Sequence, residues 1–178
     1  MRLENKVAVV TGGGSGFGTG IAERFAEEGA ALVIADINMD AARDTASRLN
    51  GMPVKADVSL NDDMAALAAA VMDSHGRIDI FVNNAGITHL PTPMDEIEEA
   101  EFDRVLMVNT KSVYLSARHV VPVMKRQESG VILNIASTAG VSPRPNLSWY
   151  NATKGWMITA TKSMAVELAP FGIRVNAL

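Results

Sequence analysis

Short runs of apolar residues alternate with longer helical patterns along this 178-residue chain. A strand exposed on one face alternates apolar and polar residues. Four of these runs, 6–11, 31–35, 78–82 and 131–135, are too continuously apolar for that and are typical of strands buried on both faces of a parallel sheet, while 53–56 is a weaker run and 173–177 a final one. Because strand and helix alternate, we predict a doubly wound, Rossmann-like α/β fold with about six parallel strands and helices on both faces. The expected strands are 6–11, 31–35, 53–56, 78–82, 131–135 and 173–177.

Five helical patterns lie between these strands. The third begins after Ser59, and Asp62 stands three residues later, which resembles a capping box with Asp in place of Glu. No linker, repeat or low-complexity segment divides the chain, so we expect residues 1–178 to form a single domain. The expected helices are 18–28, 39–49, 60–75, 99–125 and 149–169.

Composition narrows the class of protein. The chain is 48% hydrophobic and 20% charged, which is ordinary for a globular domain. A net charge of -4 gives no electrostatic reason to bind nucleic acid or an anionic membrane, so a small-molecule partner is expected. No cysteine is present, which excludes disulfides and thiolate catalysis. With no signal-peptide pattern and no apolar run of roughly 18 residues, we expect a cytoplasmic protein without a membrane span.

The three histidines do not indicate a metal site. His75, His89 and His119 stand far apart, and no pair has the spacing of metal ligands, so packing or surface roles are expected and no metal is predicted. His89 belongs to a loop that follows the segment NNAG, and this loop is the one that could border a substrate.

The segment TGGGSGFGTG follows the first expected strand and leads into a helix. Gly12, Gly16 and Gly18 frame this turn, and without Cβ atoms they let a dinucleotide pyrophosphate approach the backbone at the helix amino terminus. Two other glycine motifs do not fit: a Walker loop needs Lys where Thr19 stands, and a nucleophile elbow around Ser15 needs Gly where Phe17 stands.

An acidic residue strengthens the dinucleotide interpretation. Asp36 ends the second strand, where a carboxylate accepts hydrogen bonds from the adenosine ribose and repels a 2′-phosphate. Neither Ser15 nor Ile37 is the basic residue that a 2′-phosphate requires, so NAD is favoured over NADP. The simpler alternative is that Asp36 is a solvated residue that opens a loop.

Tyr150 and Lys154 lie one helical turn apart and therefore share a face. An ammonium beside a phenol stabilises the phenolate, which makes the pair a usable acid and base for hydride transfer between a carbinol carbon and a nicotinamide. Ser137 ends the strand before them and could donate to the substrate oxygen. Alone, each has a simpler explanation as a half-buried aromatic, a helix-surface lysine or a strand-end turn.

Together, these motifs resemble the classical short-chain dehydrogenase/reductase family. The chain has TG-x-x-x-G-x-G at 11–18, NNAG at 83–86, a serine at 137 and Y-x-x-x-K at 150–154, in the family's order. The resemblance implies an NAD-dependent oxidoreductase of secondary alcohols or ketones, of the 3-oxoacyl thioester, sugar or polyol type. It also implies that Asn109 is catalytic and keeps a water in place for a proton relay, and that Lys154 binds the nicotinamide ribose.

The resemblance assigns roles to further residues. It implies that Asp57 contacts the adenine ring and that the segment NNAG lines the cofactor cleft and braces the sheet. The implied catalytic residues are Asn109, Ser137, Tyr150 and Lys154. The implied cofactor-binding residues are Gly12, Ser15, Gly16, Phe17, Gly18, Asp36, Ile37, Asp57, Val58, Asn84, Ala85 and Gly86, together with Tyr150 and Lys154.

The resemblance also sets expectations for parts outside the active site. The sequence stops at RVNAL, so we expect it to lack the family's carboxyl-terminal substrate loop and last strand, and to turn over substrate weakly in this form. The rival function is a non-catalytic dinucleotide-binding module or scaffold. Helices 99–125 and 149–169 form the family's usual subunit contact, which predicts a homodimer or homotetramer. Arg144 and Asn146 lie on the expected substrate rim, where Arg144 is either an exposed loop residue or an anion contact.

Overall fold

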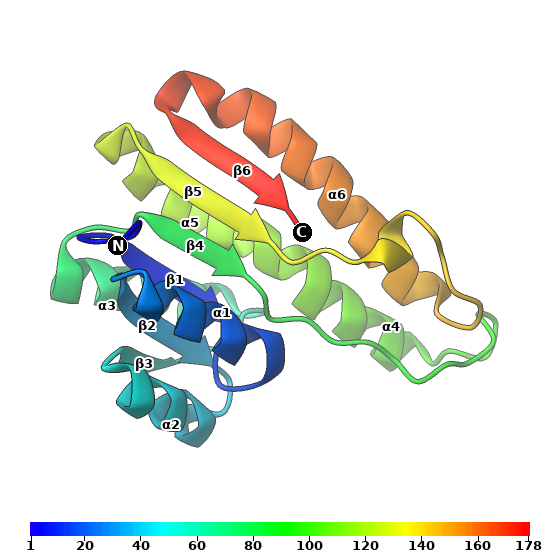
Figure 1. Cartoon of the computed structure of the whole chain (residues 1–178). Helices are drawn as coiled ribbons and strands as arrows, with labels where there is room; N and C mark the ends of the chain where they lie inside the picture. Colours follow the sequence, from blue (N-terminus) through cyan, green and yellow to red (C-terminus); the bar gives the residue numbers. More distant parts are fainter.

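A computed structural model describes residues 1–178 and contains one six-stranded parallel sheet with helices on both faces (Figure 1). The predicted fold class is therefore confirmed. The strands lie in the order β3-β2-β1-β4-β5-β6, so the chain reverses direction across the sheet between β1 and β4. Their bounds are Val7–Thr11 (β1), Ala31–Asp36 (β2), Met52–Lys55 (β3), Ile80–Asn83 (β4), Gly130–Asn134 (β5) and Ile173–Ala177 (β6).

The helices follow the predicted order, with one interruption. The expected helix 99–125 is present but contains a π-helical turn, Met107–Lys111, between α4 and α5. A side chain within a π turn is re-aimed relative to a regular helix, and such turns are frequent at functional sites. The helix bounds are Gly16–Glu27 (α1), Met39–Leu49 (α2), Asn61–His75 (α3), Glu99–Leu106 (α4), Ser112–Gln127 (α5) and Ser148–Leu168 (α6).

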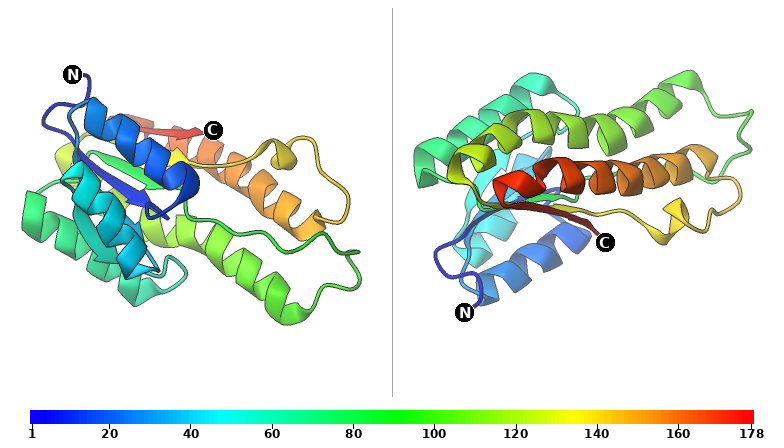
Figure 2. Two further views of the ribbon diagram at one scale, coloured as in Figure 1. Left: turned by 60° about the horizontal axis from the view of Figure 1, so that its bottom comes forward. Right: turned by 90° about the horizontal axis from the view of Figure 1, so that it is seen from above.

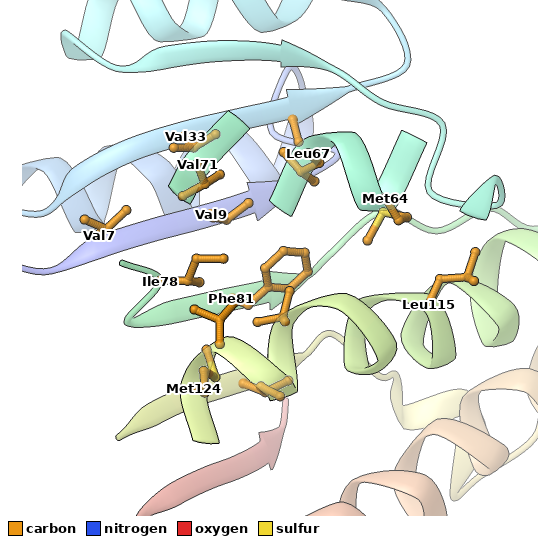
Figure 3. Packing of buried hydrophobic residues seen from close by; sticks show 14 of the residues in the cluster. Val7, Val9, Val33, Met64, Leu67, Val71, Ile78, Phe81, Leu115 and Met124 are labelled. Carbon is orange, nitrogen blue, oxygen red and sulfur yellow. The ribbon is translucent and has the colours of Figure 1, made fainter. Parts of the chain in front are cut away.

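The continuously apolar strands supply two cores, one on each face of the sheet. Alternate residues of one strand point to opposite faces, so Val7 and Val9 of β1 belong to one core and Ala8 and Val10 to the other. The larger core is covered by α3, α5 and α6 and is centred on Phe81 (Figure 3). The smaller core is covered by α1 and α2 through their alanines. The central strands β1, β2 and β4 are buried on both faces, which explains why they lack a polar alternation, whereas the edge strand β6 alternates buried and exposed residues.

The predicted capping box is wrong. Leu60 occupies the cap position of α3, and the Ser59 hydroxyl instead donates to the Asp57 carboxylate at 2.6 Å. Asp63, rather than Asp62, reaches back and accepts a hydrogen bond from the Asp57 backbone N–H at 2.8 Å. The loop before α3 is therefore organised around Asp57, which lies in the loop just beyond the carboxyl end of β3.

Two loops extend beyond the carboxyl ends of the strands and lie side by side (Figure 2). One leads from β4 to α4, the other from β5 to α6. The backbone N–H of Thr92 donates to the Asn146 carbonyl at 2.9 Å, and the Trp149 indole donates to the Met94 carbonyl at 3.3 Å. The Trp149 ring also meets Phe102 of α4 edge to face. None of the helices combines the length and the apolar composition that a membrane span requires.

Candidate functional site

The glycine-rich loop packs too tightly to accept side chains at its central positions. A Cβ on Gly18 would overlap the Gly12 carbonyl oxygen, and one on Gly14 would lie 2.9 Å from the Asp36 carboxylate. Gly12 has φ +61°, which favours glycine. The result is a backbone cradle at the amino terminus of α1, which is the shape and polarity that a dinucleotide pyrophosphate requires.

Residues of the NNAG segment hold this loop from the neighbouring strand. The Asn84 side-chain amide donates to the carbonyls of Thr11 and Gly12 at 2.8 and 3.1 Å. The Thr11 hydroxyl donates to the Val82 carbonyl at 3.0 Å and accepts the backbone N–H groups of Asn84 and Ala85. These contacts tie β1 to β4 at the point where strand order reverses, which is where open α/β sheets bind ligands.

The Asp36 carboxylate lies at one end of a cavity of about 560 Å³. It accepts hydrogen bonds from the backbone N–H groups of Gly14 at 3.0 Å and Asn38 at 2.9 Å, so its position is fixed. The cavity runs from the glycine-rich loop to the start of the π turn, and we call it the Asp36 cavity. It is lined by Gly12, Asp36, Ile37, Ala56, Asp57, Val58, Ser59, Ala85, Gly86, Ile87, Arg104, Met107 and Val108.

A second cavity, of about 540 Å³, brings together three of the four predicted catalytic side chains, Ser137, Tyr150 and Lys154. We call it the Tyr150 cavity. Tyr150 and Lys154 come from one face of α6, and Ser137 comes from the segment that follows β5. The remaining lining residues are Phe17, Ile21, Asn84, Gly86, Ile87, Thr88, Ile135, Ala136 and Leu178.

The Lys154 ammonium is buried in the wall of the Tyr150 cavity. Its Nζ donates to the Ile135 carbonyl at 2.8 Å and lies 5.8 Å from the centre of the Tyr150 ring. Because burial disfavours the charged form, the pKa of Lys154 falls from 10.5 to about 8. A negative charge nearby would offset this desolvation, so the site favours an anion beside the lysine.

Ser137 is oriented by the short 3-10 helix Thr138–Gly140 that it caps. Its Oγ accepts the backbone N–H of Ala139 at 3.1 Å, which leaves the hydroxyl hydrogen to donate into the cavity. The 3-10 helix packs against α6 closely enough that a Cβ on Gly140 would lie 2.7 Å from the Gly155 backbone nitrogen. Ser137 is therefore held against the helix that carries Tyr150 and Lys154.

Asn109, the fourth predicted catalytic residue, is fully buried in the π turn and lines neither cavity. Its Oδ1 accepts the Ile87 backbone N–H at 2.8 Å. Its Nδ2 donates to the Ile87 carbonyl at 2.8 Å and to the Thr153 hydroxyl at 3.1 Å. The amide therefore clamps the backbone of Ile87, a residue that borders both cavities.

The two cavities share a wall. Gly86 and Ile87 line both of them, so the Asp36 cavity and the Tyr150 cavity are neighbours beyond the carboxyl ends of the strands. Both Asn109 Oδ1 and Lys154 Nζ approach this wall, at 3.4 and 3.5 Å from the point that a Cβ on Gly86 would occupy. One extended ligand can therefore reach from Asp36 to Tyr150.

The remaining residues that the sequence singled out lie around or apart from the two cavities. Ser15, Gly16 and Gly18 shape the loop and line neither cavity, while Phe17 is 86% exposed and lies at the rim of the Tyr150 cavity. Arg144 faces a separate depression with Ser148 and Asn151. His89 is buried and its Nδ1 donates to the Leu90 carbonyl at 2.7 Å; it lines neither cavity. No cluster of metal-ligating side chains is present.

Sequence reasoning missed several residues of the site. Ile87 and Thr153 complete the contacts of Asn109, and Arg104, Met107 and Val108 form one wall of the Asp36 cavity. A threonine inside a helix beside Tyr150 offered a weak signal for Thr153. The residues of α4 and the π turn gave none, because only the tertiary packing of these helical turns brings them to the cavity.

The glycine cradle, the fixed carboxylate and the position of both at the strand reversal define a dinucleotide-binding protein of the Rossmann type. A family model described as short chain dehydrogenase matches residues 6–178. The chain is 45% identical to 4-formylbenzenesulfonate dehydrogenase of Comamonas testosteroni, and the match covers 100% of this chain and 73% of that protein. It is 37% identical to levodione reductase of Leifsonia aquatica over 99% of this chain and 69% of that protein.

Solved structures agree. 3-Ketoacyl-(acyl-carrier-protein) reductase from Brucella melitensis, complexed with NADH, superposes with a TM-score of 0.97 at 48% identity, over 98% of this chain and 75% of that chain. NAD+-bound xylitol dehydrogenase superposes with a TM-score of 0.94 at 33% identity, over 99% of this chain and 70% of that chain. The chain belongs to the short-chain dehydrogenase family, as the four sequence motifs predicted.

Proposed function

We propose that this protein is an NAD(H)-dependent oxidoreductase that interconverts a secondary alcohol and a ketone, with Ser137, Tyr150 and Lys154 as its reacting site. The observation that carries the proposal is the shared Gly86–Ile87 wall, which joins the cavity of Asp36 to the cavity of those three side chains. Two related proteins have been solved with NADH or NAD+ bound, which supports the same cofactor here.

In this proposal, the adenosine half of the cofactor lies in the Asp36 cavity and the nicotinamide half in the Tyr150 cavity. Asp36 accepts the ribose hydroxyls, Asp57 and Val58 border the adenine, and the cradle of Gly12, Ser15, Gly16, Phe17 and Gly18 holds the pyrophosphate. Asn84 and Ala85 keep that cradle against β4. When bound, the nicotinamide supplies or accepts the hydride.

The chain's own residues handle the proton. Ser137 donates a hydrogen bond to the substrate oxygen and holds it beside the Tyr150 hydroxyl, which gives the proton in reduction and takes it in oxidation. Lys154 stabilises the phenolate and holds the ribose of the nicotinamide half. Asn109 fixes the Ile87 wall and supports a water-mediated path for the proton.

We also propose that residues 1–178 act as one dinucleotide-binding unit, that the protein works in the cytoplasm, and that it assembles as a homodimer or homotetramer through the helices at 99–125 and 149–169. Tyr114 and Trp156 on those helices are 53% and 44% exposed, which gives apolar surface for such a contact. Light scattering coupled to size exclusion measures the assembly, and a monomer at micromolar concentration would contradict it.

Calorimetric titration with NADH and with NADPH tests the cofactor. We expect NADH to bind at least tenfold more tightly, because the Asp36 carboxylate repels a 2′-phosphate. Equal binding of the two would contradict the Asp36 assignment.

A spectrophotometric screen then tests turnover, with acetoacetyl-CoA as an oxoacyl thioester, xylitol as a polyol and 4-hydroxybutan-2-one as a simple ketone. Turnover of one of these supports the proposed chemistry. Tight NADH binding without turnover of any carbonyl or alcohol in a wider panel would favour a non-catalytic binding module instead.

A further inference from the structure

A continuous chain of buried hydrogen bonds connects helix α6 to the wall between the two cavities. The Thr153 hydroxyl donates to the Tyr150 carbonyl at 2.7 Å and accepts from Asn109 Nδ2 at 3.1 Å. Asn109 in turn bonds both backbone groups of Ile87 at 2.8 Å. This series of hydrogen bonds therefore begins at the backbone of the proposed acid/base residue, Tyr150, and ends at the backbone of Ile87, which lines both cavities.

Every side-chain polar atom in this series of hydrogen bonds has a partner. Both N–H groups of the Asn109 amide are used, one on Ile87 and one on Thr153, and the Thr153 hydroxyl acts as donor and acceptor at once. Thr153 is 1% exposed and Asn109 0% exposed. A buried network that is satisfied throughout holds one arrangement, whereas removing one member leaves its neighbour unpaired and free to turn.

We infer that Thr153 is a positioning residue, which sets the distance between the Tyr150 turn of α6 and the Ile87 wall by fixing the Asn109 amide. This inference rests on the proposed function of Tyr150, but its first consequence, the order of the Ile87 backbone, does not. Thr153 touches neither cavity, so its effect passes through Asn109 and through the Tyr150 carbonyl.

The same helix offers a matched control. Thr161 also donates to a helix carbonyl, that of Met157 at 2.8 Å, and accepts from an asparagine amide, that of Asn134 at 2.8 Å. Thr161 is 6% exposed and belongs to a second series of buried hydrogen bonds, in which the Asn83 amide donates to Asn134 at 2.8 Å. Thr161 therefore repeats the chemistry of Thr153 two turns further along α6, away from Tyr150 and Ile87.

The test compares Thr153→Val with Thr161→Val and with Thr153→Ser. Valine keeps the shape and removes the hydroxyl, and serine restores it. We expect the two valine variants to lose similar thermal stability. Amide hydrogen exchange at Ile87 can be measured by NMR without any ligand. The exchange rate should rise about tenfold or more in Thr153→Val, because Asn109, which accepts the Ile87 N–H, is then no longer held by Thr153. It should stay near the wild-type rate in Thr161→Val and Thr153→Ser.

Steady-state kinetics supply the second readout, with any probe that the wild-type protein turns over. We expect kcat to fall about tenfold in Thr153→Val at nearly constant KM for NADH, and to be restored in Thr153→Ser. If Ile87 exchange and kcat in Thr153→Val match those in Thr161→Val, Thr153 is only structural and the inference is wrong. A wild-type protein without turnover would count against the proposed function, while the exchange rates would still decide the role of Thr153.

Discussion

The two cavities of this protein are built in different ways. The Asp36 cavity and the adjoining glycine loop depend on the absence of side chains, since Gly14 and Gly18 have no room for a Cβ. The Tyr150 cavity depends on side chains that are anchored by others: Ser137 by its short helix, Lys154 by Ile135, and the Ile87 wall by Asn109. Substitutions in the Asp36 cavity and glycine loop should therefore lower cofactor affinity, and substitutions in the Tyr150 cavity should lower kcat.

Tyr150→Phe gives the largest expected effect and tests the second half of this contrast. The ring still fills the cavity, but the proposed proton donor is lost, so kcat should fall by about 10² to 10⁴. NADH affinity measured by calorimetry should change less than threefold. A large loss of NADH affinity would show that the two cavities are not separable in this way.

Gly18→Ala tests whether the glycine loop acts on cofactor binding. The added methyl overlaps the Gly12 carbonyl, so the loop must move, and we expect NADH affinity to fall about 100-fold or more. Gly20 provides the control, because it lies in the same helix and a Cβ there meets nothing within 4 Å. Gly20→Ala should bind NADH normally and gain up to about 1 kcal/mol of stability from helix propensity. Equal behaviour of the two variants in the titration would contradict the cradle.

Asp36→Ala should produce a smaller change, confined to the adenosine end. Removing the carboxylate takes away both the proposed ribose acceptor and the proposed repulsion of a 2′-phosphate, so NADH affinity should fall and NADPH affinity rise, each by about tenfold. The kcat at saturating NADH should stay within threefold of wild type. A change in kcat without a change in cofactor preference would place Asp36 outside the ribose site.

Lys154→Met should reveal a stability cost at the catalytic end. The pKa of Lys154 is about 8 in the folded protein, below the ordinary 10.5, so burial of the charged form destabilises the fold at pH 7. That cost fades as pH rises from 8 to 10.5, where the folded protein has released the proton and the unfolded chain has not. Methionine avoids the charge but leaves the Ile135 carbonyl unpaired.

We therefore expect Lys154→Met to be about 1–2 kcal/mol more stable than wild type at pH 7, and no more stable at pH 10. Urea unfolding at the two pH values measures this, and the other titrating groups cancel in the difference between the proteins. A stability difference that is independent of pH would mean that the lysine is not buried as a cation.

The difference between the cavities also explains what sequence analysis could reach. The buried central strands, the glycine loop and Asp36 could be predicted because each leaves a pattern of residue types within a short stretch of sequence. The contacts of Asn109 depend on three segments at once, the β4 loop, the π turn and α6, and no spacing along the chain records them. The capping box failed for a related reason, since Asp57 competes for the Ser59 hydroxyl.

The wall that Gly86 and Ile87 give to both cavities has a kinetic consequence. In the proposed binding mode the dinucleotide would extend past this wall from the Asp36 cavity into the Tyr150 cavity, so its nicotinamide half would form part of the surface on which the substrate lies. The protein should therefore take its two reactants in sequence, dinucleotide first. Product-inhibition patterns distinguish such an ordered scheme from a random one, and a random pattern would mean that the substrate binds without the nicotinamide beside it.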